Sequence, residues 1–224
     1  MEIIQNVHHI PGVMANPYLV ICPEGLTLVD TGLPGSQRRI LRYIARLGYQ
    51  PADLKRILIT HADLDHVGGL AALKAASGAK VYAHPIEAEA IAAGRSSREL
   101  KPRNLLTRLT FRLTSQLVRV SPMQVDGFLN DGQELPELGG LRVLATPGHT
   151  PGHVSFFSES TGVLFSGDSI VSRGQALRGS QGANTWDQAK ADSSLKTQAA
   201  LGARIVCPGH GPVVLNAAGK IPTA

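Results

Sequence analysis

Four apolar segments of this chain each run into a glycine-containing turn that carries histidine or aspartate. The segment RILIT (56–60) runs into THADLDHVGG (60–69), and later apolar segments run into TPGHT, SGDS and PGHG. These last three turns carry His149, Asp168 and His210. Short apolar runs bounded by glycine are typical of buried strands. The pattern therefore favours a fold in which several strands end close together and present polar side chains there.

The length and composition of the chain fit one large domain. A chain of 224 residues that is 43% hydrophobic can bury a sizeable core, and 24 glycines and 14 prolines suit many short strands and tight turns. Cys22 and Cys207 lie in apolar runs and are interpreted as buried hydrophobes rather than a disulfide scaffold. The N-terminus does not resemble a signal peptide, and no stretch approaches about 18 apolar residues. We therefore expect a soluble, cytoplasmic protein with no membrane anchor.

The periodicity of apolar residues predicts helices and strands in two different mixtures. The first part alternates between them, with strands predicted at 18–22, 26–30, 56–60 and 79–84 and helices at 36–48 and 67–77. The second part is richer in strands, predicted at 141–146, 153–158, 162–167 and 203–207, with a helix at 187–201. Two sheets with helices outside them predict a layered α/β or α+β architecture.

Residues 84–127 interrupt this rhythm. The stretch NLLTRLTFRLTSQLVRV (104–120) has leucines at helical spacing, including Leu106, Leu109 and Leu117, which predicts an inserted amphipathic helix. Residues 95–119 hold seven basic residues and one acidic residue, an excess of +6 in a chain of net charge +5. We favour a lid over the site that offers arginine to anionic substrates. A dimer contact, a membrane-surface element and a solvated face are the alternatives.

The turn THADLDHVGG places four side chains that can bind metal within six residues: His61, Asp63, Asp65 and His66. Aspartate at a helix start is ordinary N-cap chemistry, which explains one aspartate but not two flanked by histidines. Imidazole suits zinc and iron, and a carboxylate can bridge two cations about 3.5–4 Å apart. Together with the three later turns, the motif predicts a two-metal centre that activates water for hydrolysis.

Five motifs, from LVDTG to PGHG, occur in the order found in metallo-β-lactamase-fold hydrolases, and the chain resembles the compact glyoxalase II-like group of that superfamily. The resemblance covers almost the whole chain. It implies an α+β fold, a four-layer αββα sandwich with the metals at one edge where the two sheets meet. It also implies a single domain over residues 1–224, with the helical insert at about 84–127 within it.

The resemblance assigns a role to each residue of the motifs. His61 and His149 resemble ligands of a first metal, Asp65, His66 and His210 resemble ligands of a second, and Asp168 resembles the bridging carboxylate. Asp30, in LVDTG, resembles a residue that braces the metal loops from beneath. Asp65 and Asp168 are the implied catalytic residues, and Asp65 would orient the attacking hydroxide and take its proton.

Asp63 departs from the pattern of the family, because this chain has H-x-D-x-D-H where H-x-H-x-D-H is usual. The side chain could coordinate the first metal, could turn away and leave that site weak, or could hydrogen-bond a histidine or metal-bound water. We favour coordination, since flavodiiron proteins of the superfamily carry a carboxylate at this place. We expect two divalent metal ions, with zinc preferred and iron or manganese as the alternative at the site containing Asp63.

The predicted function is hydrolysis of a small ester, thioester, lactone or related substrate, preferably anionic. A non-haem iron oxidoreductase of the same fold is the alternative, and a catalytically silent metal-binding protein ranks third. The expected partner is a small-molecule substrate, and a homodimer is left open. Nucleic acid is not expected, because nucleases of this fold usually carry a large extra domain for which the chain has no room.

Overall fold

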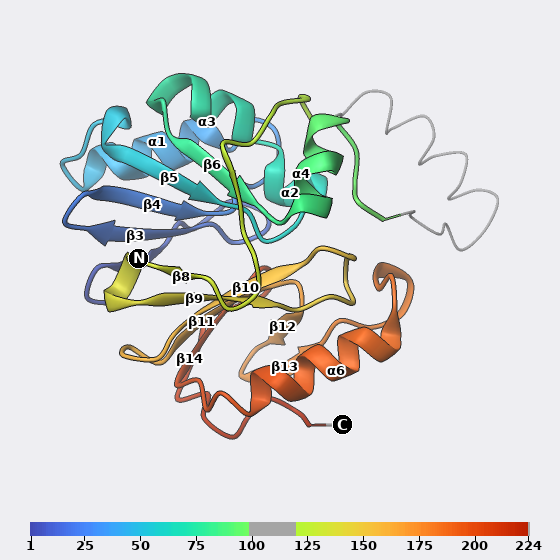
Figure 1. The fold of residues 1–224 in the computed structure, drawn as a ribbon. Coiled ribbons are helices and arrows are strands. Elements are labelled where there is room, and N and C mark those ends of the chain that lie inside the picture. The colour runs from blue at the N-terminus through green and yellow to red at the C-terminus, as the bar shows by residue number, and fades with distance from the viewer. Residues whose placement is uncertain (99–119, 224) are drawn as a thin grey trace.

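The chain folds into four layers, in which two β-sheets are stacked face to face between outer helices (Figure 1). The structure is a computed structural model that describes residues 1–98 and 120–223. Helices α1 (Gln37–Arg46) and α3 (Leu70–Ser77) cover the outer face of the first sheet. Helix α6 (Gln188–Ala199) covers the outer face of the second. The expected α+β sandwich is confirmed.

The first sheet has the strand order β1-β2-β3-β4-β5-β6-β7 within the described residues. Pairing is antiparallel from β1 to β4 and parallel from β4 to β7, because helices connect the later strands. The strands are β1 (Glu2–Ile4), β2 (Val7–His9), β3 (Tyr18–Cys22), β4 (Gly25–Val29), β5 (Leu54–Leu58), β6 (Lys80–Ala83) and β7 (Gly127–Phe128).

The second sheet has the order β15-β14-β11-β10-β9-β8 in the part of the chain that the structure describes. Its pairing is antiparallel except between β11 and β14, which the crossover through α6 makes parallel. A separate ribbon pairs β12 (Ile170–Arg173) with β13 (Ala176–Gly179). The strands of the sheet are β8 (Glu134–Leu135), β9 (Leu141–Ala145), β10 (Val154–Ser158), β11 (Val163–Gly167), β14 (Ile205–Pro208) and β15 (Val214–Leu215).

Alternation of side chains along the strands sorts the apolar residues into three cores, one between each pair of layers. In β11, Val163 and Phe165 face the core between the sheets, whereas Leu164 faces the core beneath α6. In β4, Leu28 joins the third core with Ile40 of α1. Both sheets are thus covered on both faces, and polar groups gather where the strands end.

The predicted helix at 67–77 is wrong in its extent, because the structure has two helices there. Helix α2 (Leu64–Val67) begins earlier than predicted, and α3 follows it after Gly68 and Gly69. Glycine has low helix propensity, and a Cβ on Gly68 would lie 2.3 Å from Pro34 Cδ. The backbone therefore passes close to the loop after β4 at this break, which brings His66 on α2 toward Asp30.

The described ends of the predicted insert are part of the first half of the molecule. Helix α4 (Pro85–Ala92) lies within 84–127, and both Ile91 and Val120 belong to the core of the first sheet. The predicted amphipathic helix through Leu106 and Leu117 lies outside the described residues. Among the described helices, none has both the length and the apolar character that crossing a membrane requires.

Candidate metal centre

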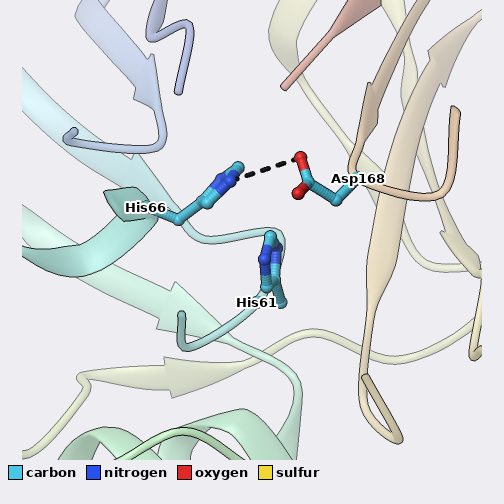
Figure 2. Close-up of side chains that lie close together, drawn as sticks. All are labelled: His61, His66 and Asp168. Atoms are coloured by element: carbon cyan, nitrogen blue, oxygen red, sulfur yellow. Dashed lines mark ion pairs between the residues drawn. The ribbon is translucent and has the colours of Figure 1, made fainter. Parts of the chain in front are cut away.

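The side chains that the motifs predicted converge from both sheets at one edge of the sandwich. His61 follows β5 and His66 lies on α2, whereas His149, Asp168 and His210 follow β9, β11 and β14. Figure 2 shows His61 and His66 on one side and Asp168 facing them from the second sheet. The expectation that several strand ends present polar side chains to one place is confirmed.

Among the described residues, three overlapping groups of side chains bring nitrogen and oxygen atoms within 4.8 Å of one another, and one of them, His61, His66 and Asp168, links the other two. The first ligand group is His61, Asp63 and His149, and the second ligand group is Asp65, His66 and His210. Asp168 lies between them: its Oδ2 is 3.5 Å from Nε2 of His149 and 3.3 Å from Nε2 of His210, and its Oδ1 is 3.3 Å from Nε2 of His66. The grouping is the one the motifs predicted, and the roles of these residues as metal ligands stay a prediction.

The three buried imidazoles are anchored through Nδ1, so that Nε2 faces the other ligands. Their partners are Thr60 Oγ1 at 3.0 Å for His61, Asp30 Oδ2 at 2.8 Å for His66 and Ser180 Oγ at 3.1 Å for His149. Thr60 Oγ1 itself donates to Asp30, which leaves its lone pair to accept from His61. Such anchoring fixes the tautomer and ring orientation that a metal-binding histidine needs.

Asp30 makes the contacts expected of a residue that braces the ligand loops from beneath. It is 1% exposed, and its carboxylate accepts from the Thr60 amide at 2.9 Å and the Thr60 hydroxyl at 2.8 Å as well as from His66. Its φ of +58° is left-handed, a conformation that costs an ordinary residue free energy but that aspartate tolerates. Asp30 thus touches His66 directly and His61 through Thr60.

Asp63 is turned into the site and shares its carboxylate with residues outside it. Oδ2 lies 3.3 Å from Nε2 of His149 and 3.7 Å from Nε2 of His61. The same oxygen accepts from Arg98 at 2.6 Å, and Oδ1 accepts from the Ser96 hydroxyl at 2.6 Å. Arg98 belongs to the basic segment that was predicted to meet an anionic substrate, but its side chain is only 5% exposed. The positive charge of Arg98 therefore pairs with Asp63.

The surroundings of the ligands hold the acidic groups ionised. Although burial opposes ionisation, the His149 hydrogen bond and the charge of Arg98 hold the pKa of Asp63 well below its usual range. Burial and the charge of His66 lower the pKa of His61 well below the ordinary value. Hydrogen bonds to Asp168 and Asp65 raise the pKa of His210 to about 9. Negative carboxylates therefore face imidazole nitrogens across a small space, which suits a bound cation.

Three buried atoms at the centre of the site test whether its residues fit a metal. Within the described chain, His61 Nε2, His66 Nε2 and Asp168 Oδ1 make no hydrogen bond of ordinary geometry, although the last two face each other at 3.3 Å. Buried polar atoms of native proteins are nearly always satisfied, and leaving one unpaired costs roughly 1–3 kcal/mol. Nitrogen and carboxylate oxygen atoms that face one another in this way are the donors that zinc and iron take. The site therefore fits divalent cations.

The other histidines near the site have structural partners. His153 is 1% exposed, its Nδ1 lies 2.8 Å from Thr146 Oγ1, and its Nε2 accepts the Asp168 amide at 3.0 Å. Burial and the charge of His149 lower the pKa of His153 to about 3, in keeping with a neutral ring that accepts. His84 is the N-cap of α4, where its Nδ1 accepts the Ile86 amide. His153 thus positions Asp168.

Three contributors to the site were missed by reasoning from sequence. Glu87, on α4, is fully buried and bonded to both ligand loops. Ser180, after β13, anchors His149, and Arg98 was noticed only as one charge of a basic segment. No motif marks these three residues in the sequence, because tertiary packing, and not spacing along the chain, places them beside the ligands.

Comparison with known proteins agrees with the geometry. A family model described as the metallo-beta-lactamase superfamily matches residues 10–210. The probable metallo-hydrolase YflN of Bacillus subtilis (strain 168) is 27% identical, over 94% of this chain and 85% of that protein. A hydroxyacylglutathione hydrolase of Albidiferax ferrireducens is 33% identical, over 82% of this chain but only 58% of that protein.

A solved structure extends the comparison to three dimensions. The crystal structure of a metallo-beta-lactamase family protein from Thermus thermophilus is similar, with a TM-score of 0.76 and 28% identity. The match covers 98% of this chain and 78% of that one. The four-layer arrangement is thus shared with a protein of this superfamily.

Proposed function

The chain belongs to the metallo-beta-lactamase superfamily, and from that premise we propose that it is a binuclear metal-dependent hydrolase of small acyl substrates. The observation that carries the proposal is the position of Asp168 between two complete ligand groups. Its Oδ2 lies within 3.5 Å of His149 on one side and 3.3 Å of His210 on the other. A carboxylate so placed can bridge two cations.

The residues of the site divide the work of hydrolysis between them. Two divalent cations held by the two ligand groups would supply a water of lowered pKa and would polarise the oxygen under attack. Asp65 and His210 are the more open members of the site, with side chains 28% and 38% exposed, so solvent and substrate approach from their side. Burial opposes ionisation of Asp65, but its hydrogen bond to His210 keeps its pKa below the ordinary value. We assign Asp65 the acceptance of a proton from the water.

Thioesters are the substrate class to test first. A relative of this chain is a hydroxyacylglutathione hydrolase, although the match spans 58% of that protein. Simple esters and lactones have the same electrophilic carbonyl and belong in the same panel. Arg98 is buried against Asp63, so its charge is not offered to a substrate.

The test combines metal analysis with a substrate panel of thioesters, esters, lactones and phosphodiesters. We expect two metal equivalents per chain and cleavage of at least one acyl substrate. Asp168→Asn should lower the activity by more than the roughly 10–100-fold that is typical when an outer partner of a ligand is lost. The effect should be larger because Asp168 contacts both ligand groups. Asp192→Asn, on the surface of α6, is the matched control. Protein that holds two metals and cleaves no member of the panel would contradict the proposal.

Asp63 favours a second candidate, a non-haem iron oxidoreductase. Its carboxylate is directed into the first ligand group, where it would supply a harder oxygen donor than the usual imidazole. Metal analysis of protein produced without added metal separates the candidates. Iron in the wild type, replaced by zinc in Asp63→His, would support the oxidoreductase, whereas zinc or manganese without iron in the wild type would exclude it.

A further inference from the structure

We infer that Glu87 is a positioning residue that holds the first ligand group together, and that its loss weakens metal binding by this group and not by the second. The inference rests on the proposed function only in taking the two ligand groups as metal sites. Its subject is a residue that no motif marks and that does not contact the ligand atoms themselves. It follows from the hydrogen bonds of one buried carboxylate.

Glu87 lies on α4 with an exposure of 0%. Its Oε1 accepts from the Ser97 hydroxyl at 2.8 Å, the Thr150 hydroxyl at 2.8 Å and the Gly152 amide at 3.0 Å. Its Oε2 accepts from the Ala62 amide at 2.8 Å. These four donors, all from described residues, match what an ionised carboxylate can accept, and so the group is satisfied without any contact with water.

The donors come from segments that carry the first ligand group. Ala62 lies between His61 and Asp63, and Thr150 directly follows His149. Ser97 directly precedes Arg98, the ion-pair partner of Asp63. One carboxylate therefore ties together the loop from the first sheet, the loop from the second sheet and the residue that neutralises Asp63. None of these donors is next in sequence to a member of the second ligand group.

The loop after His149 is fitted closely around this carboxylate. A Cβ on Gly152 would lie 2.9 Å from Glu87 Oε1 and 2.7 Å from His84 Nδ1, closer than real Cβ atoms approach. Glycine at this position lets the backbone amide reach the carboxylate. The distance between the loop of His61 and the loop of His149 is thus set by a group buried between them and not by contact of the ligands alone.

Glu87→Gln tests the inference. Glutamine has nearly the same volume, but its NH₂ group would face N–H or O–H groups that now donate to the carboxylate. Zinc or cobalt affinity is measured by titration against a competing chelator, with His149→Ala and His210→Ala as references that assign the two sites. We expect the Kd of the first site to rise roughly 10–100-fold, the range typical when an outer partner of a ligand is lost. The Kd of the second site should stay within about threefold, since none of its ligands is next in sequence to a residue that donates to Glu87.

Glu137→Gln is the matched control. Glu137 is also a buried glutamate, 1% exposed, but it is bonded to Thr27 and Arg56 and not to the ligand loops. It should leave both metal affinities unchanged. If Glu87→Gln fails to fold, Thr150→Val removes a single donor while keeping a branched side chain, and should weaken the first site a few-fold.

The outcomes separate this inference from the proposed function. Selective weakening of the first site supports the inference even if the wild type cleaves no substrate, in which case only the proposed function fails. Equal weakening of both sites, or no change in a folded variant, overturns it. A wild type whose metal content does not depend on His149 overturns it as well, because there is then no first site for Glu87 to hold.

Discussion

The first and second ligand groups contain the same kinds of side chain in different surroundings. In the first, His61, Asp63 and His149 have side-chain exposures of 0%, 14% and 6%, and Arg98 neutralises Asp63. In the second, Asp65 and His210 are 28% and 38% exposed, and they pair with each other at 3.2 Å. One half of the site is enclosed and balanced by a cation of the protein, and the other is open to solvent.

This difference teaches that donor identity alone does not set what a metal site binds. A cation that binds to the first group must compete with the Arg98 guanidinium, which lies 2.6 Å from the Asp63 carboxylate. A cation entering the second must compete with a proton, because the pKa of His210 is raised to about 9 by its hydrogen bonds to Asp168 and Asp65. The two sites should therefore respond differently to charge substitutions and to pH, and four experiments test this.

The largest effect is expected from Asp30→Asn. This substitution should disturb the ligands of both groups and so remove the difference between the first and the second group. Asparagine tolerates the left-handed backbone but turns an amide toward Thr60 and His66, leaving buried donors unpaired. We expect a loss of about 3–5 kcal/mol in the free energy of unfolding. Chemical denaturation of the metal-free protein measures it. A loss below about 1 kcal/mol would show that the brace is dispensable.

Arg98→Met should sharpen the contrast by acting on the first group alone. The metal-free protein should lose about 2 kcal/mol of stability, because Asp63 keeps its charge without a partner. Metal binding by the first group should tighten roughly tenfold, since a neighbouring positive charge is removed. Competition titration of the metal measures this effect. Weaker binding in the folded variant would mean that Arg98 positions Asp63 more than it competes with the cation.

From about pH 6.5 to 9, metal binding by the second group should depend on pH in a way that binding by the first group does not. Because the pKa of His210 is raised, its protonated form stabilises the metal-free protein below about pH 6.5, and this stability is lost as the pH rises through about 9. Over the same interval, metal binding by the second group should tighten and release protons. Calorimetry of His149→Ala in buffers of different ionisation enthalpy counts those protons. Metal binding without proton release would contradict the prediction.

The smallest effect is expected from Asn16→Ala, which should loosen the turn that carries His210. The Asn16 amide donates to the carbonyls of Pro208 at 2.9 Å and Gly211 at 2.7 Å, on either side of that histidine. We expect a loss of about 1 kcal/mol in stability and a few-fold weaker second site, with the first unchanged. Asn184→Ala, at an exposed position, is the control. A change confined to the first site would contradict this account.

Much of the fold could be predicted from the sequence, because it is recorded in local patterns. The strands ending near Leu58 and Gly167 are short apolar runs, and the alternation of helix and strand in the first half was readable. The ribbon of β12 and β13 was missed, since IVSR and ALRG lack a strong apolar period. The break between α2 and α3 was missed because it depends on the close approach of Gly68 to Pro34, which only packing decides.

The sequence by itself determined which donors the candidate site contains and which of them are neighbours. His61, Asp63, Asp65 and His66 share one turn, so covalent spacing keeps them together in any compact fold of this chain. Only the tertiary structure decided what surrounds them. Arg98 meets Asp63 across 35 residues and Glu87 joins Thr150 across 63, because buried carboxylates need partners that packing alone can bring.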